Sequence, residues 1–147
     1  MAQKIILGSD HAGYPLRRWL ADRLKAEGNQ VEEVGAQSED SYDYPVAADE
    51  LVAKLLDFDF GILICGSGIG ISIRANRYSH VRAALCTSET MAQLARMHNH
   101  ANVLCLGGRL TTENEAWGIL QAFIETEPSE EARHVRRIEE LDSPLVC

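Results

Sequence analysis

The chain alternates short apolar runs with segments whose residue pattern suits helices, and this alternation limits the fold more than any other feature of the sequence. The runs that read as strands cover residues 4–8, 30–34, 60–65, 81–86 and 103–106. Strands separated by helices pair in parallel through right-handed crossovers. The sequence therefore predicts an α/β fold with a doubly wound, mainly parallel five-stranded sheet and helices on both faces.

The helical segments carry recognisable boundary signals. Pro15 suits a first helical turn, Gly28 suits a C-terminal cap, and Thr112-x-x-Glu115 forms a capping box. The predicted helices cover residues 15–28, 45–56, 70–76, 88–98, 112–126 and 129–142. The last is charged and follows Pro128. We expect it to form a C-terminal helix that packs against something other than its own sheet.

The third apolar run breaks at Cys65 and passes directly into the turn Gly66-Ser67-Gly68-Ile69-Gly70. Its glycines leave backbone N–H groups open to an anion where the next helix begins. Such donors stabilise a thiolate, which is the reactive form of a cysteine. The alternative is a buried cysteine before an ordinary strand-to-helix turn.

Polar side chains also follow the other predicted strands. Asp10 and His11 follow the first strand, Tyr44 follows the second, and Arg109 follows the fifth. In doubly wound sheets, ligands bind at the carboxyl ends of the strands. We therefore expect these groups to lie with Cys65 along one edge of the sheet.

Two further groups extend this expectation. His98 and Asn99 close the helix before the fifth strand, and we expect them at the same edge. Arg133 and Arg137 are one helical turn apart on the C-terminal helix, a spacing at which two guanidinium groups can clamp a phosphate. Such a coincidence of thiol, imidazole, anion loop and arginines favours a ligand site.

Each of these residues also has a purely structural interpretation. Asp10 can cap the turn after the first strand, and His11 and His98 can be solvated residues at helix ends. The basic cluster of the last helix can pair with the glutamates around it as a solvated face. The remaining histidines are expected at the surface: His80, His100 and His134.

Composition bounds the class of protein. The chain has 147 residues, which suits one domain spanning residues 1–147. Its formal charge of -8 argues against a nucleic-acid or membrane-surface binder. No apolar run is long enough to span a bilayer, and the four cysteines form no C-x-x-C pair or zinc-like spacing. These features favour a cytoplasmic protein with reduced thiols, with Cys86 and Cys105 in the core.

Motifs spread along the chain resemble one family. They are GSDHAG near the start, DYP, CGSGIGISIRANR, HNHANVLCLGGR and RHVRR. Over nearly its whole length the chain is similar to the type B ribose-5-phosphate isomerases of the ribose/galactose sugar-phosphate isomerase family. The resemblance implies a Rossmann-like fold and an aldose–ketose isomerase that interconverts ribose 5-phosphate and ribulose 5-phosphate. It also implies no metal or organic cofactor, and a homodimer or dimer of dimers with active sites between subunits.

The resemblance also implies a role for each matching residue. Cys65 resembles the base that moves a proton between C1 and C2, and His98 resembles the group that opens the sugar ring. Ser67 and the loop amides resemble the groups that stabilise a cis-enediolate intermediate; the loop residues are Gly66, Gly68, Ile69 and Gly70. The residues that resemble contacts to sugar oxygens are Asp10, Tyr44 and Asn99. Those that resemble phosphate ligands are His11, Arg109, Arg133 and Arg137.

The chain departs from the family pattern in two places. Ser67 stands where many members carry threonine, which keeps the hydroxyl group, and His100 stands where aspartate or asparagine is expected. Isomerisation of allose 6-phosphate, galactose 6-phosphate or a tetrose phosphate therefore stays open as an alternative. A non-catalytic sugar-phosphate binding protein is a further alternative, although such a protein has no need of a thiol and an imidazole in its site.

Overall fold

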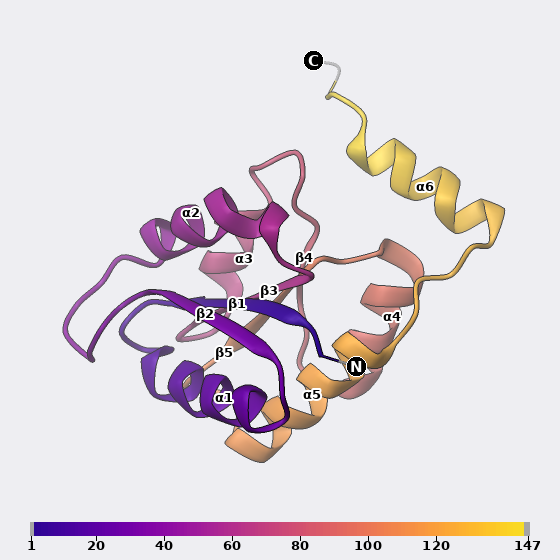
Figure 1. Cartoon of the computed structure of the whole chain (residues 1–147). Coiled ribbons are helices and arrows are strands. Elements are labelled where there is room, and N and C mark those ends of the chain that lie inside the picture. The colour runs from indigo at the N-terminus through magenta and orange to yellow at the C-terminus, as the bar shows by residue number, and fades with distance from the viewer. Residues whose placement is uncertain (1, 146–147) are drawn as a thin grey trace.

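The parallel sheet predicted from the alternation of strands and helices is present in the computed structural model, which describes residues 2–145 (Figure 1). The strands of this part of the chain are β1 (Lys4–Ser9), β2 (Gln30–Gly35), β3 (Phe60–Cys65), β4 (Ala83–Leu85) and β5 (Val103–Gly107). They lie in the order β2-β1-β3-β5-β4, and every neighbouring pair is parallel. The chain reverses its direction of winding between β1 and β3, which lie at the centre of the sheet.

Helices cover both faces of this sheet, as predicted. They are α1 (Tyr14–Ala26), α2 (Tyr44–Lys54) with the 3-10 turn η1 (Leu55–Asp57), α3 (Ile69–Ala75), α4 (Glu89–Asn99), α5 (Glu113–Glu125) and α6 (Ala132–Asp142). Side chains of a strand alternate between the faces, so Ile5 and Leu7 pack with α1, α4 and α5, whereas Ile6 packs with α2 and α3. Strand β3 is buried along its whole length. The doubly wound fold class is confirmed.

The boundary signals read from the sequence are also present. Gly28 follows the end of α1 with a φ of 93°, and its N–H donates to the Lys25 carbonyl at 3.0 Å. The hydroxyl of Thr112 accepts the Glu115 N–H at 3.2 Å, and the Glu115 carboxylate accepts the Thr112 N–H in return, which completes the predicted capping box. Within residues 2–145, no helix combines the length and apolar character needed to cross a membrane.

Strand β4 is shorter than the predicted run of residues 81–86. The side-chain amide of Asn76 takes the place of a neighbouring strand at the free edge of β4: it accepts the Ala83 N–H at 2.9 Å and donates to the Ala83 carbonyl at 2.9 Å. The Asn102 side chain accepts the Arg82 N–H at 2.8 Å just before the strand begins. Side chains thus satisfy backbone groups at the start of β4 that would otherwise need another hydrogen-bond partner.

Helix α6 stands away from the sheet, as predicted, and begins at residue 132 rather than 129 (Figure 1). Polar contacts hold it at both ends. At its start, His100 Nε2 lies 2.9 Å from the Ser129 carbonyl oxygen, to which it can donate. At its end, Arg82 forms an ion pair with Asp142 at 2.8 Å, while its Nε donates to the His100 carbonyl at 3.3 Å. His100 and Arg82 therefore connect both ends of α6 to the region where α4 ends.

The loops after β1, β3 and β5 touch through their backbones, and glycines make this possible. A Cβ atom added at Gly13 would lie 2.3 Å from the Ile64 carbonyl oxygen, and one added at Gly107 would lie 2.7 Å from the Ser67 carbonyl oxygen. Contacts this short exclude any side chain. The glycines therefore fix the spacing of three loops at the carboxyl edge of the sheet.

We expect Gly13→Ala to destabilise the fold by about 1–3 kcal/mol, because the new methyl group must push apart two backbone segments. Gly66→Ala is the matched control, since the nearest contact of its Cβ would be the end of the flexible Arg109 side chain, at 3.3 Å. Urea unfolding of both variants measures the difference. Equal loss of unfolding free energy in the two variants would contradict the role of the Gly13 contact.

Candidate active site

Cys65 lies at the carboxyl end of β3, inside the turn that starts α3. Its Sγ accepts a hydrogen bond from the Gly68 N–H at 3.2 Å, and its side chain is buried, with 4 % exposed. Gly68 reaches this position with a φ of 81°, in the left-handed region that favours glycine. A backbone donor aimed at the sulfur stabilises a thiolate. The turn therefore directs one backbone donor at the sulfur of Cys65.

The loop around Cys65 also carries a cation. The Arg109 N–H donates to the Gly66 carbonyl at 3.0 Å, and the Arg109 guanidinium lies over Gly66. Ser67 Oγ accepts the Ile69 N–H at 3.2 Å, which orients the hydroxyl at the exposed side of the turn. Arg109 and Ser67 thus lie beside Cys65, as the sequence predicted.

Asp10 lies at the end of β1, next to the loop of Cys65. Its Oδ1 accepts the Gly13 N–H at 2.9 Å, and its own N–H donates to the Ile64 carbonyl at 3.3 Å. The structural interpretation of Asp10 as a turn cap is therefore correct. The cap uses one carboxylate oxygen, and Oδ2 makes no hydrogen bond to the described residues, so the cap still leaves an acceptor for a sugar hydroxyl.

His11 follows Asp10 and is held by the segment before α2. Its Nδ1 lies 3.0 Å from the Tyr42 backbone nitrogen and 3.2 Å from the Tyr42 carbonyl oxygen, so it can accept from the one or donate to the other according to its tautomer. The Tyr42 hydroxyl donates in turn to the Glu50 carboxylate, and this hydrogen bond raises the pKa of Tyr42 to about 12. Glu50 and Tyr42 therefore fix the position of His11.

Tyr44 opens α2 and reaches the same edge. Its ring lies so close to Gly70 that an added Cβ there would be 2.6 Å from the ring and 2.9 Å from the hydroxyl oxygen. Gly70 must therefore lack a side chain for Tyr44 to approach the start of α3. The structure brings together the predicted residues at this edge, and we call them the Cys65 cluster: Asp10, His11, Tyr44, Cys65, Gly66, Ser67, Gly68, Ile69, Gly70 and Arg109.

The other described thiols differ from Cys65. Burial raises the pKa of Cys86 to about 11, and burial likewise raises the pKa of Cys105. Both residues lie in the apolar core, as predicted from their place in apolar runs. Cys147 lies outside the described residues. Cys65 alone of the three described thiols is held next to a loop donor and a guanidinium group.

The prediction that His98 and Asn99 share an edge with Cys65 is wrong within one chain. A crossover helix runs antiparallel to its strands, so the end of α4 lies at the opposite, amino edge of the sheet. Two backbone contacts fix this position: the Ala101 N–H donates to the Ala95 carbonyl at 3.1 Å, and the Asn102 carbonyl accepts the Gly61 N–H, at the start of β3, at 3.0 Å.

Arg133 and Arg137 also lie at the amino edge, since α6 packs against the end of α4. Both side chains are on the exposed face of α6, as their spacing predicted. Arg133 forms an ion pair with Glu131 at 3.1 Å, so the solvated-face interpretation holds for that pair. Arg137 makes no ion pair within the part of the chain that the structure describes. The second group of predicted residues, which we call the α6 group, is His98, Asn99, Arg133 and Arg137.

His134 is a residue that the sequence left at the surface and that the structure buries. Its side chain is 7 % exposed, and its ring stacks on His98 with centroids 4.2 Å apart and planes 9° from parallel. Burial lowers the pKa of His134, and the neighbouring His98 ring lowers it further. The helical spacing of His134 and Ile138, both on the buried face of α6, was the sequence signal that could have placed it there.

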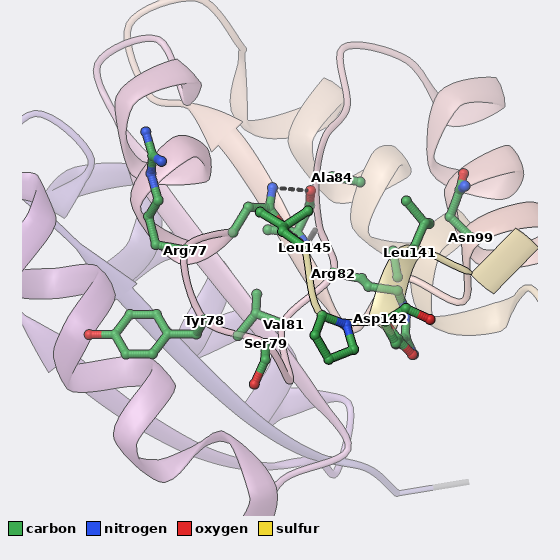
Figure 2. Close-up of a pocket in the computed structure, with 15 residues that line it drawn as sticks. Arg77, Tyr78, Ser79, Val81, Arg82, Ala84, Asn99, Leu141, Asp142 and Leu145 are labelled. Atoms are coloured by element: carbon green, nitrogen blue, oxygen red, sulfur yellow. Dashed lines mark hydrogen bonds and ion pairs between the residues drawn. The ribbon is translucent and has the colours of Figure 1, made fainter. Parts of the chain in front are cut away.

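A cavity of about 710 Å³ lies at the amino edge, between α6 and the segment before β4 (Figure 2). Figure 2 shows Arg77 and Tyr78 on one side and Leu141 and Asn99 on the other. Cys65 is not among its lining residues. Within residues 2–145, no group of three or more histidine, cysteine or acidic side chains is placed to hold a metal ion. Asn99 is the member of the α6 group that lines this cavity.

The motifs, the fold and the Cys65 cluster agree with one known family. A family model described as Ribose/Galactose Isomerase matches residues 5–141. The chain belongs to the ribose/galactose isomerase family. The resemblance stated from the motifs is thereby confirmed.

Individual members are similar over nearly the whole chain. The chain is 37 % identical to ribose-5-phosphate isomerase B of Escherichia coli, covering 93 % of each chain. It is 43 % identical to ribose-5-phosphate isomerase B of Mycobacterium leprae, covering 92 % of this chain and 86 % of that one. The ribose 5-phosphate isomerase of Thermotoga maritima superposes with a TM-score of 0.93 at 46 % identity, covering 97 % of this chain and 99 % of that one. The family fold is thus present throughout.

The lowered pKa of His134 predicts a pH dependence of stability. An unfolded chain protonates this histidine as the pH falls below about 6.5, while the folded chain resists protonation. The unfolded state then binds more protons, so the free energy of unfolding decreases as the pH falls through that value. His134→Phe should remove this part of the loss. Urea midpoints measured from about pH 8 to pH 5 for both proteins test it; parallel profiles would contradict the prediction.

Proposed function

We propose that this chain is an aldose–ketose isomerase that interconverts ribose 5-phosphate and ribulose 5-phosphate. The observation that carries the proposal is the Cys65 cluster. In this cluster, the sulfur of Cys65 accepts a backbone hydrogen bond. Beside it lie groups that are suited to bind the hydroxyls and the phosphate of a sugar phosphate. Relatives that bear the name ribose-5-phosphate isomerase B, at 37–43 % identity over most of the chain, support the same substrate.

The proton transfer is assigned to Cys65. The thiolate takes the proton from C2 of the open aldose; the electrons of that C–H bond form the C1=C2 double bond, and the carbonyl electrons move onto O1. The resulting cis-enediolate is stabilised by Ser67 and by the amides of the loop, residues 66–70. The thiol then returns its proton to C1, while the hydroxyl proton of O2 passes to O1. The product is the ketose, and the thiolate is regenerated.

Ring opening and phosphate binding are assigned to the remaining residues. His98 moves a proton at the ring oxygen of the furanose, and Asn99 holds a sugar oxygen. Asp10 and Tyr44 contact hydroxyl groups. The phosphate ligands are His11, Arg109, Arg133 and Arg137. Binding energy from the phosphate, far from the reacting carbons, then positions C1 and C2 against Cys65.

Two copies of the chain are required for this assignment, because the Cys65 cluster and the α6 group lie at opposite edges of one sheet. We infer that the α6 group of one subunit meets the Cys65 cluster of another, in a homodimer or a dimer of dimers. Exposed apolar pairs flank the edge strand and suit such a contact: Ile69 and Ile73 on α3, and Met91 and Leu94 on α4. Each active site would then lie between subunits.

The proposal includes one domain, residues 1–147, with no metal or organic cofactor. A catalytic thiol must stay reduced, which suits the cytoplasm rather than an oxidising compartment. Nucleic-acid and membrane partners are not part of the proposal. Isomerisation of a six-carbon or four-carbon sugar phosphate uses the same chemistry, so a screen of phosphorylated tetroses, pentoses and hexoses decides between these substrates.

We expect Cys65→Ala to lower kcat for ribose 5-phosphate by about 10²- to 10⁴-fold, the usual contribution of a general base. The measurement is formation of ribulose 5-phosphate by protein in EDTA. Cys86→Ala is the matched control, because it removes a buried thiol that the mechanism does not use. Wild-type turnover by Cys65→Ala would refute the role of the thiol, and restoration of activity to the EDTA-treated enzyme by a divalent ion would refute the metal-free chemistry.

A wild-type protein that binds ribose 5-phosphate without converting it would establish the non-catalytic alternative.

Sharing of the site between subunits predicts complementation. Cys65→Ala and His98→Asn chains, unfolded together and refolded, should recover about a quarter of the wild-type activity, because half of the dimers are mixed and each mixed dimer has one intact site. The control pair is Cys65→Ala with Arg109→Ala. Both of these residues belong to the Cys65 cluster, so their mixed dimers have no intact site. Equal recovery by the two pairs, or none by either, would contradict the shared site.

A further inference from the structure

His134 lies between two residues of the α6 group and touches both. Its ring stacks on His98 with centroids 4.2 Å apart and an interplanar angle of 9°. Arg133 Nε lies 3.4 Å from His134 Nε2. The ring is buried, with 7 % exposed, although it has no role in the assignment above. One imidazole therefore contacts both the ring-opening group and a phosphate ligand.

The contact with Arg133 defines the state of the His134 ring. A guanidinium nitrogen can only donate, so His134 Nε2 is the acceptor and its proton is on Nδ1. The Glu131 carboxylate lies 3.9 Å from the same Nε2 and 3.1 Å from the Arg133 guanidinium. The Nε2 lone pair thus faces the arginine within the chain rather than a bound anion.

We propose that His134 is a positioning residue that holds the His98 imidazole by stacking and the Arg133 guanidinium through Nε2, and thereby keeps the two groups at a fixed spacing. The inference rests on the proposed function, since it concerns how the α6 group is arranged for that reaction. The two contacts of the His134 imidazole then have separable effects: the stack on His98 affects opening of the sugar ring, and the hydrogen bond from Arg133 affects phosphate binding.

The way α6 is attached supports this role. The helix is held at its ends by the polar contacts of His100 and Arg82, and on its buried face by His134 and Ile138. His134 is the member of that face that contacts residues of the α6 group. A parallel stack fixes the plane of the His98 ring, and small errors in the placement of a catalytic group are costly. His98 is on α4, whereas Arg133 and His134 are on α6, so the stack of the two rings fixes the position of Arg133 relative to His98.

Two substitutions separate the two contacts. His134→Gln keeps an acceptor near the position of Nε2 but removes the ring, whereas His134→Phe keeps a flat ring against His98 but removes the acceptor. We expect His134→Gln to lower kcat for ribose 5-phosphate by about ten- to a hundredfold with little change in KM. We expect His134→Phe to keep kcat and to raise KM by about three- to tenfold, the effect of one lost hydrogen bond.

A substrate that cannot form a ring gives the decisive comparison. Erythrose 4-phosphate has no furanose to open, so His134→Gln should leave its kcat unchanged, while His134→Phe should raise its KM as it does for ribose 5-phosphate. His80→Gln is the matched control, since His80 is half-buried and lies outside both groups of site residues. If the wild-type enzyme does not accept erythrose 4-phosphate, the kcat and KM split on ribose 5-phosphate stands as the test.

The outcomes distinguish the proposal from its alternatives. Equal kcat losses on both substrates, or proportional losses in both variants, would overturn the positioning role. A KM increase in both variants with kcat unchanged would instead make His134 a direct phosphate ligand. The ring-proton shift of His98 in NMR spectra provides a readout without turnover: it should move in His134→Gln and stay in His134→Phe. Absence of isomerase activity in the wild type would refute the proposed function, and the NMR result would then decide the stacking role by itself.

Discussion

In a parallel sheet, every crossover helix must carry the chain back to the amino edge before the next strand can begin. This constraint separates the residues that carry chemistry here. Strand ends and the loops that follow them, with Asp10, Cys65 and Arg109, lie at the carboxyl edge. The end of α4 and the helix that rests on it lie at the other edge. Neither edge has both the thiol and His98, so the arrangement of one chain explains why the proposed site needs two.

The two groups of site residues are built in different ways. The Cys65 cluster depends on backbone contacts, in which glycines let three loops approach each other and one amide reach the sulfur. Its geometry is therefore set by the backbone of the sheet and of its loops. The α6 group depends on side-chain contacts of a helix that stands apart from the sheet, with an ion pair at one end and a histidine at the other. Single side-chain substitutions can therefore change the arrangement of the α6 group more readily than that of the Cys65 cluster.

Much of the fold and of the Cys65 cluster could be predicted from the sequence, because these features depend on local patterns. Apolar runs that end in glycine or polar residues define the strands and their carboxyl ends, and a parallel sheet brings those ends together. The edge at which His98 lies could not be predicted in the same way, since that requires the direction of α4 relative to the strands. The burial of His134 depends on where α6 packs; the helical spacing of His134 and Ile138 indicates that they share a face, but not what that face packs against. The late start of β4 accompanies side-chain amides of Asn76 and Asn102 that bind the backbone of Ala83 and Arg82, a contact that the pattern of the strand itself does not predict.

Asn76 has a consequence for assembly. The outward backbone groups of a sheet's last strand form a template for an additional strand, and proteins block such edges with short strands or covering side chains. Both devices are present at β4, which has three residues and whose Ala83 N–H and carbonyl are bound by one asparagine amide. The Asn76 amide thus occupies the positions at which an added strand would pair with Ala83, which makes this edge a poor template for a sheet that continues from one molecule to the next. Growth at this side of the molecule is restricted to contacts between helices, which can close after a defined number of copies.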